Sequence, residues 1–343
     1  MKHRTFFWFM LPSGIAMLLF IALPIVSVFV QSLFVENEKV LVEVVTSGPF
    51  GTTTQVVVDE AATAVLNAAN PLGQFNGFGT YANRNHLAFA EVAEFWRSSD
   101  SLGAFARQVY GLPFYKALTF TLAYTFIVTP LIIALGFLIA VAVNALPRLL
   151  KGPVIFTSLL PMIITPLVGS LILFWMIDSR GVIGKTLQFI FEDPDLSLKA
   201  SPMLTWITLM VYGVWSSAPF AFVVFYAGLQ TVPQDTLESA MIDGATRWQR
   251  IRFVVLPYLM PLVTFIALIQ LMDNFRVFEP IVGFNAEANA TSLSWIIYND
   301  LRGSEVALFG SAAATSMLTI LGVAILLTPV LIRTWRDFSA KGH

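Results

Sequence analysis

Six long apolar runs without Asp, Glu, Lys or Arg limit most strongly what this chain can fold into. They cover residues 6–34, 117–147, 152–177, 200–234, 253–272 and 306–332. A helix of ~20 apolar residues crosses the ~30 Å hydrocarbon core of a bilayer. Hydrophobic residues make up 57% of the chain and charged residues only 12%, about half the charged share of a soluble domain. The sequence therefore predicts an all-α polytopic membrane protein with six transmembrane helices.

The distribution of Lys and Arg predicts which loops face the cytoplasm. Ten of the 20 basic residues lie in four short segments, 1–5, 146–152, 231–256 and 332–343. Their density there is nearly three times that in the longer connections. Because cytoplasmic loops are enriched in Lys and Arg, we expect both termini and the loop 231–256 to be cytoplasmic.

These assignments predict the organisation of the chain. It comprises a cytoplasmic N-terminus with the first helix at 1–34, an outer insert at 35–116, a five-helix core at 117–333 and a cytoplasmic tail at 334–343. The first run is too long for a signal peptide and lacks a small-x-small cleavage site, so we expect an uncleaved helix. In the insert, segments 39–45 and 52–58 predict a β-hairpin, and 59–69 and 86–97 predict helices.

Several kinds of chemistry are excluded. The chain has no cysteine, and its three histidines are far apart in sequence, so neither disulfides nor a local His-rich metal motif is expected. The segment 179–186 resembles a phosphate-binding loop, but Ser179 replaces the first glycine. The triplet 289–291 matches a glycosylation signal that is too short to be specific. A formal net charge of −1 gives no reason to expect nucleic-acid binding, and no catalytic set can be assembled in the spans.

The cytoplasmic loop 231–256 carries the most specific pattern. Asp235 followed by Glu238 predicts a capping-box-like helix start, and Gly244 fits a left-handed helix end. Thr246 can cap a second helix. The sequence therefore predicts a helix-turn-helix joined at both ends to membrane helices, which can transmit a push from a cytoplasmic partner.

The residues of this loop resemble a known family. Glu238-Ser-Ala-Met-Ile-Asp-Gly-Ala245, followed by Leu256-Pro257, resembles the EAA loop of ABC-importer permeases, with Ser239 in place of the usual Ala. Phe78-Gly-Thr-Tyr81 and Asn274-Phe275 are similar to carbohydrate-type permeases of the maltose and glycerol-phosphate kind. The resemblance covers most of residues 70–340. It implies the type I ABC importer permease architecture in a bacterial inner membrane, with 35–116 as a small periplasmic insert between helices 1 and 2.

The resemblance also implies partners. A second permease subunit would complete the path as a heterodimer, an ATPase homodimer would bind ATP and Mg on the cytoplasmic side, and a periplasmic protein would deliver substrate. This chain would lie in lipid, bind no cofactor or metal itself and catalyse no reaction. The implied ATPase-coupling residues are Glu238, Ser239, Ala240, Met241, Ile242, Asp243, Gly244 and Ala245. The Glu238 carboxylate would face basic groups of the ATPase.

The resemblance further implies candidate substrate-binding residues in the fourth and fifth spans, most of which match sugar-contacting or adjacent positions of the maltose-type permease. They are Gly213, Ser216, Ser217, Phe220, Gln270, Asp273, Asn274 and Arg276. Hydroxyl, amide and carboxylate groups pair with sugar hydroxyls, and an aromatic ring covers the apolar sugar face. Asp273 and Arg276 either contact substrate or form a local i,i+3 salt bridge. If Arg276 faces the path unpaired, an anionic sugar derivative is a possible cargo.

Prolines inside the spans, Pro166 among them, suggest broken helices around an interior route. The sequence therefore favours a permease subunit of an ATP-driven importer for a sugar or sugar derivative. One alternative is an ABC permease for a polyol or glycerol phosphate. The other is a secondary carrier or channel that works without an ATPase.

Overall fold

The computed structural model describes residues 3–48, 51–303 and 307–340. The chain divides into two compact units, each described here by itself. The first comprises Met1–Tyr115 and Ile296–Thr319, and the second comprises Lys116–Trp295 and Ile320–His343. The predicted start of the last span, at residue 306, and residues 341–343 of the predicted tail lie outside the described residues.

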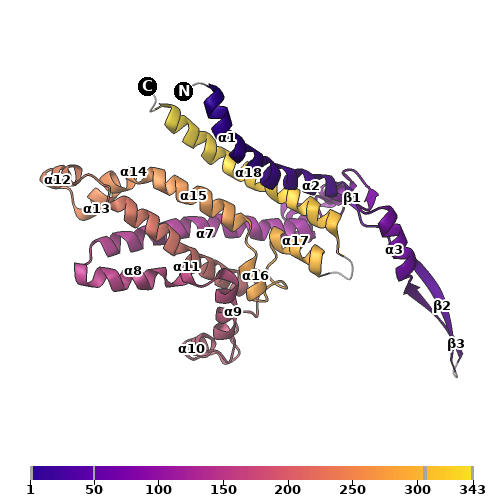
Figure 1. Cartoon of the computed structure of the whole chain (residues 1–343). Helices are drawn as coiled ribbons and strands as arrows, with labels where there is room; N and C mark the ends of the chain where they lie inside the picture. The colour runs from indigo at the N-terminus through magenta and orange to yellow at the C-terminus, as the bar shows by residue number, and fades with distance from the viewer. Residues whose placement is uncertain (1–2, 49–50, 304–306, 341–343) are drawn as a thin grey trace. The chain divides into compact units, whose positions relative to one another are not determined.

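The first unit begins with an apolar helix and continues into a small mixed insert. Helix α1 (His3–Met17), a π-helical segment η1 (Leu18–Ala22) and α2 (Leu23–Gln31) form one apolar stretch, Phe6–Gln31. Strand β1 (Phe34–Val35) pairs antiparallel with β4 (Gln74–Phe75). The predicted hairpin is confirmed: β2 (Leu41–Gly48) pairs antiparallel with β3 (Gly51–Val58), and both lie beyond α3 in Figure 1.

Short helices complete this unit. Helix α3 (Glu60–Ala69) is capped by Asp59, whose carboxylate accepts a 2.9 Å hydrogen bond from the Ala62 N–H. The others are α4 (Gly79–Ala82), α5 (Phe89–Ser98), α6 (Leu102–Tyr110) and part of α17 (Leu293–Arg302). The predicted helix at 86–97 begins later than expected, because His86 is buried in the preceding turn and bonded to Asn83, Ser311 and Thr315.

The second unit is helical. Its elements are α7 (Pro113–Asn144), α8 (Arg148–Ile163), α9 (Pro166–Ile177), α10 (Val182–Ile190), α11 (Pro202–Leu229), α12 (Gln234–Ile242), α13 (Arg247–Arg250), η2 (Ile251–Val255), α14 (Leu256–Tyr258), α15 (Met260–Phe275) and α16 (Glu279–Gly283). Helix α18 (Phe309–Ala340) begins in the first unit and ends in the second. Figure 1 shows α12 and α13 at one end of α11 and α15, with α9, α10 and α16 towards the opposite end.

Four described helices are long and apolar enough to cross a membrane, namely Phe6–Gln31, Pro113–Asn144, Pro202–Leu229 and Phe309–Thr334. The other two predicted spans are bent rather than straight. Arg148–Ile163 meets Pro166–Ile177 at 96°, and Arg247–Tyr258 meets Met260–Phe275 at 66°. The total is six if each bent pair counts as one span.

The core of the second unit joins these helices. Large aromatic residues are almost fully buried there, including Phe120 on α7 and Phe222 and Phe225 on α11. Small residues allow the closest approaches: a Cβ atom at Gly136 of α7 would lie under 3.0 Å from the Phe222 backbone nitrogen. The outward side chains of the same helices are Leu, Ile, Val and Phe, as a lipid-facing surface requires.

Candidate functional site

A cavity of about 510 Å³ lies within the second unit, where α7, α11 and the end of α15 meet the starts of α9 and α16. Its lining comprises Tyr124, Pro166, Tyr212, Ser216, Ser217, Asp273, Asn274, Arg276, Val277, Glu279 and Pro280. Hydroxyl, amide, carboxylate and guanidinium groups therefore meet two tyrosine rings in one space. Such a mixture of apolar walls and a few polar groups is typical of a small-molecule site.

The break between α8 and α9 supplies one edge of the cavity. Pro166 is the first residue of α9, and its carbonyl oxygen accepts a 2.6 Å hydrogen bond from the Tyr212 hydroxyl on α11. Gly169 allows this contact, because a Cβ atom there would lie 2.8 Å from the Tyr212 oxygen. The tyrosine thus satisfies a polar backbone group at the break, as a non-aqueous interior demands.

The end of α15 supplies the opposite edge. Asn274 is buried, and its Nδ2 donates to the Thr129 Oγ1 of α7 at 2.9 Å. Arg276 ends the helix, and its Nη2 lies 3.1 Å from the Asp273 Oδ1, with about half of each side chain exposed. After the helix ends, the carbonyl of Val277 accepts a 2.6 Å bond from the Ser292 hydroxyl.

The two edges are held together by close packing of α9 against α16. Ser170 is fully buried, and its hydroxyl donates to the Leu167 carbonyl at 2.8 Å and lies 3.4 Å from that of Glu279. A Cβ atom at Gly283 would fall far inside contact distance of the Ser170 Oγ. Only glycine at 283 therefore permits this spacing, which positions Glu279 and Pro280 at the cavity.

The structure brings five of the eight predicted substrate residues to the cavity: Ser216, Ser217, Asp273, Asn274 and Arg276. The other three are not part of the lining. A Cβ atom at Gly213 would collide with the Tyr124 hydroxyl, so this glycine makes room for the ring. Phe220 packs 6.4 Å from the Phe265 ring, and Gln270 is buried on α15.

Sequence reasoning missed six lining residues: Tyr124, Pro166, Tyr212, Val277, Glu279 and Pro280. Pro166 was recognised as a break but not as a wall of the cavity. Glu279 follows Asp273 and Arg276 at the same spacing of three residues, and this spacing could have identified it as a third charged residue of the site. The tyrosines carry no such signal, because their position depends on how α7 and α11 pack.

The loop 231–256 folds as a helix-turn-helix. Helix α12 ends in a Schellman arrangement: the Ala245 N–H donates to the Ala240 carbonyl at 2.9 Å and the Gly244 N–H to that of Met241 at 3.0 Å. Gly244 has φ +79°, so the predicted left-handed end is confirmed. Thr246 and Gln249 form a capping box at the start of α13, which confirms the predicted Thr246 cap.

The predicted capping-box start at Asp235 and Glu238 is wrong. Helix α12 begins at Gln234 behind Pro233, which has no side-chain cap bond. The proline ring fixes the φ angle of Pro233, and with it the path of the chain into the helix, without a side-chain hydrogen bond. Glu238 is instead exposed on the helix surface.

The loop is attached to the helices it connects but presents one open surface. Leu237 packs against the buried core, and the Tyr258 hydroxyl donates to the Thr231 carbonyl at 2.9 Å. Ile242 is 87% exposed, and Met241 is about half exposed. An exposed carboxylate beside exposed apolar side chains is a surface suited to a protein partner.

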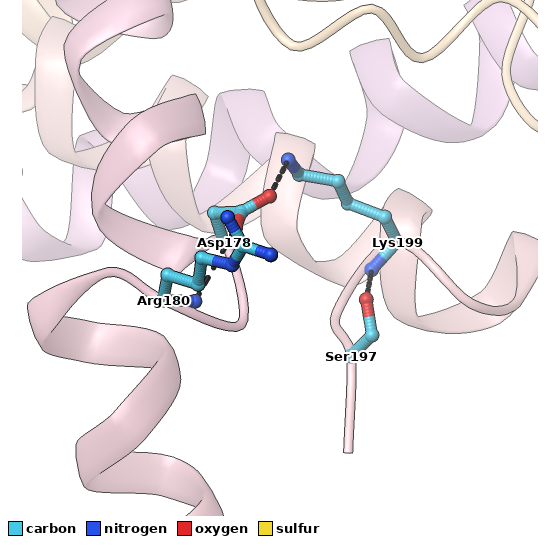
Figure 2. A network of polar contacts seen from close by, with 4 residues as sticks. All are labelled: Asp178, Arg180, Ser197 and Lys199. Atoms are coloured by element: carbon cyan, nitrogen blue, oxygen red, sulfur yellow. Dashed lines mark hydrogen bonds and ion pairs between the residues drawn. The ribbon is translucent and has the colours of Figure 1, made fainter. Parts of the chain in front are cut away.

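A polar network ties the far end of α9 to the segment before α11 (Figure 2). The Lys199 Nζ lies 3.2 Å from the Asp178 Oδ2 and 3.2 Å from the centre of the Phe174 ring. The Arg180 N–H and then the Lys199 side chain lower the pKa of Asp178. A Cβ atom at Gly184 would collide with the Asp178 carbonyl, so the glycine of the phosphate-loop-like segment serves packing.

Asn289, in the glycosylation-like triplet, also has a structural place. Its Nδ2 lies 3.2 Å from the Lys199 carbonyl oxygen, and its own carbonyl accepts a 3.1 Å bond from the Trp206 indole. The triplet therefore links the segment after α16 to the start of α11.

The region that matches known proteins includes all the residues that line the cavity. A sequence model of the family described as "Binding-protein-dependent transport system inner membrane component" matches residues 101–336. The probable ABC transporter permease protein y4oQ of Sinorhizobium fredii is 30% identical over 236 residues, which cover 67% of this chain and 74% of that protein. The trehalose/maltose transport system permease protein MalF of Thermococcus litoralis is 26% identical over 243 residues, covering 69% and 73%.

A solved structure shares the fold. One chain in the crystal structure of a bacterial ABC transporter involved in the import of the acidic polysaccharide alginate matches with a TM-score of 0.59 at 21% identity. The match covers 73% of this chain and 88% of that chain. The helical fold of this chain is therefore shared with a chain of that transporter.

Proposed function

Because the chain belongs to the family of binding-protein-dependent transport system inner membrane components, we propose that it is the permease subunit of an ATP-driven importer for a sugar. Relatives named for trehalose, maltose and multiple sugars support a carbohydrate cargo. The observation that carries the proposal is the cavity beside the break between α8 and α9, since transporters build substrate sites from discontinuous helices. The chain forms half of the path, and the energy comes from partner subunits.

The lining of the cavity supports carbohydrate recognition. Ser216, Ser217 and Asn274 offer groups that exchange hydrogen bonds with sugar hydroxyls. Tyr124 and Tyr212 offer rings against which an apolar sugar face packs. Gly213, Phe220 and Gln270 act indirectly in this proposal, by shaping the helices behind the lining.

Charge favours a neutral sugar over an anionic one. Arg276 lies against Asp273, and Glu279 adds a second carboxylate to the same lining. With one cation and two anions, the three groups have a formal charge of −1. A carboxylate or phosphate cargo would therefore meet a paired guanidinium and an extra negative charge, which disfavours glycerol phosphate and acidic sugars.

Loop 231–256 is the proposed coupling element. The exposed Glu238 carboxylate pairs with basic groups of a cytoplasmic ATPase, which binds ATP and Mg. Met241, Ile242 and Ala245 supply apolar contacts. Residues Ser239, Ala240, Asp243 and Gly244 hold the turn that presents them. Movement of the loop passes into α11 and α15, which both line the cavity.

The proposed assembly contains a second permease subunit as heterodimer partner, an ATPase homodimer and a periplasmic substrate-binding protein. The chain lies in the bacterial inner membrane with both termini cytoplasmic. Residues 35–116 then form a periplasmic insert, 117–333 the permease core and 334–343 the cytoplasmic tail.

The first experiment purifies the chain in mild detergent and identifies every bound protein by mass. A second permease and an ATPase support the importer. A chain that purifies alone and transports in proteoliposomes would instead establish a carrier or channel.

Glu238→Arg then tests coupling in the reconstituted transporter. We expect loss of ATP-driven sugar uptake with the chain still inserted in the membrane. Asp235→Arg is the matched control, because it makes the same charge change on the same helix and should leave most uptake intact. Equal uptake by both variants and the parent would refute the coupling role.

Cargo charge is tested with neutral and acidic sugars at the same concentrations. The parent transporter should carry the neutral sugar only, while Asp273→Asn with Glu279→Gln leaves Arg276 unpaired and should admit the acidic sugar. Uptake of the acidic sugar by the parent would show that the charge argument is wrong.

A further inference from the structure

Helices α5 and α6 form a small amphipathic pair in the first unit. They pack against each other across a link of three residues. Phe95 of α5 and Phe105 of α6 are half-buried, and one edge of the largely exposed Trp96 ring system meets the Phe105 ring at a centroid distance of 5.3 Å. These contacts use only part of the apolar surface of each helix.

Each helix carries a second apolar stripe that faces outward. On α5 it consists of Phe89, Ala93 and Trp96, at i, i+4 and i+7, with Phe89 60% and Trp96 64% exposed. Residues at this spacing share one face of a helix. Glu94, which is also exposed, lies on a different face.

The stripe on α6 follows the same pattern. It consists of Leu102, Ala106 and Tyr110, at i, i+4 and i+8, with Leu102 73% exposed and Tyr110 41% exposed. Arg107 lies outside the stripe, near the C-terminal end of the helix. Exposed Phe, Trp, Leu and Tyr side chains on these two packed helices give the pair apolar surface that is costly to leave in water.

Chain connectivity indicates what covers this surface. Helix α6 ends at Tyr110, and the membrane helix α7 begins at Pro113, so two residues separate the pair from a lipid-embedded segment. Trp and Tyr are enriched at the membrane–water interface, where an apolar ring and a polar tip are both accommodated. Helices with one apolar and one charged face lie in that interface.

The charges of the pair decide between two kinds of lipid attraction. Glu91, Glu94 and Asp100 oppose Arg97 and Arg107, which leaves a formal charge of −1. A polybasic surface would bind anionic headgroups, but this pair has no excess of positive charge. Apolar burial therefore drives its membrane contact.

We propose that the α5–α6 pair lies in the membrane–water interface on the non-cytoplasmic side of the membrane, with Phe89, Trp96, Leu102 and Tyr110 inserted among the lipid acyl chains. The partner is the lipid surface itself, irrespective of headgroup charge. The pair thereby holds the start of α7 at a fixed depth. This inference depends on 35–116 lying outside the cytoplasm, but not on the identity of the cargo.

The absence of cysteine from the chain makes a site-directed test direct. Ala93→Cys places a nitroxide label on the stripe, and Glu94→Cys places one on the neighbouring face as the matched control. Both positions are exposed, so neither change disturbs packing. The labelled chains are assembled with their partner subunits in nanodiscs of phosphatidylcholine, and collision with oxygen and with a water-soluble nickel chelate is measured.

The label at 93 should collide several-fold more with oxygen relative to nickel than the label at 94. The ratio should not change when anionic lipid is added. Equal nickel access at both positions would overturn the proposal in favour of a water-exposed surface. Low access to both reagents at 93 would overturn it in favour of a protein partner.

Discussion

The packing of α9 against α16 makes a quantitative prediction through Gly283. Gly283→Ala places a methyl group far inside contact distance of the buried Ser170 Oγ. Overpacking of a core typically costs about 1–3 kcal/mol, and the better helix propensity of Ala returns up to ~1 kcal/mol. We therefore expect a net loss of about 1–2 kcal/mol.

A second change isolates the cause of that loss. Ser170→Gly removes the obstructing atoms, and at its own site it forfeits the hydroxyl bond to Leu167, worth about 0.5–1.5 kcal/mol, and some helix propensity. If the clash is the cause, Ser170→Gly with Gly283→Ala should be about as stable as Ser170→Gly alone. The favourable coupling should then equal the loss from Gly283→Ala alone, about 1–2 kcal/mol, within the range for residues in contact.

The assay is thermal unfolding of the four detergent-solubilised proteins, namely parent, two single variants and the double variant. At roughly 2–4 °C per kcal/mol, the coupling corresponds to a melting temperature about 2–8 °C higher than the sum of the single effects. Strict additivity of the two losses would refute the close contact and its role in positioning Glu279.

Three further predictions follow from positions outside this contact. Gly244→Ala should cost about 1–2 kcal/mol at its left-handed φ and weaken ATPase binding in a pull-down, whereas Gly244→Asn should retain more binding. The Arg180 N–H and the Lys199 side chain lower the pKa of Asp178, so the ionised carboxylate stabilises the fold fully above pH 3.8. This stabilisation is lost as the pH falls through the lowered pKa. The difference in melting temperature between the parent protein and Lys199→Met should therefore narrow below pH 3.8. Burial lowers the pKa of His86 from 6.5, so the folded protein favours the neutral ring. The melting temperature should therefore fall as the pH drops below 6.5. His86→Gln should make this fall smaller.

The response of His86 depends on all the groups around its ring. Asn83, Ser311 and Thr315 contact the ring nitrogens, and the Asp300 carboxylate acts on the ring electrostatically. Burial raises the pKa of Asp300, and the Glu36 carboxylate raises it further. Asp300 therefore favours the fold when protonated and partly offsets the His86 effect at low pH.

The sequence predicted the apolar segments well because lipid imposes a simple rule. A run long enough to cross the bilayer must satisfy its backbone internally, and composition alone reveals such runs. Composition does not locate the bends at Ile164–Thr165 and Leu259, because apolar content is unchanged across them; Pro166 predicts a break but not its angle of 96°. They depend on packing, as the Tyr212 bond to Pro166 illustrates.

The loop residues were predictable because local spacing carried the information, whereas five cavity residues were predicted through the family resemblance. The turn at Gly244 and the Thr246 cap are set by residues within a few positions, and both were expected. The cavity combines Tyr124 of α7 with Glu279 of α16, a pairing that no local pattern encodes. Gly213 was assigned to substrate, but its neighbour is the Tyr124 hydroxyl, which a sequence without structure cannot show.

The bond between Tyr212 and Pro166 also has a consequence for how the chain is made. Helix α9 has 12 residues and rises only about 18 Å at 1.5 Å per residue, too short to cross the hydrocarbon alone. The donor for the Pro166 carbonyl lies 46 residues later in the chain, so it is synthesised after α8 and α9. Until α11 inserts, that carbonyl needs a hydrogen-bond donor other than Tyr212, from water or a chaperone. We therefore expect the bent pair to reach its final geometry late in biogenesis, when the insertion machinery releases α11 beside it.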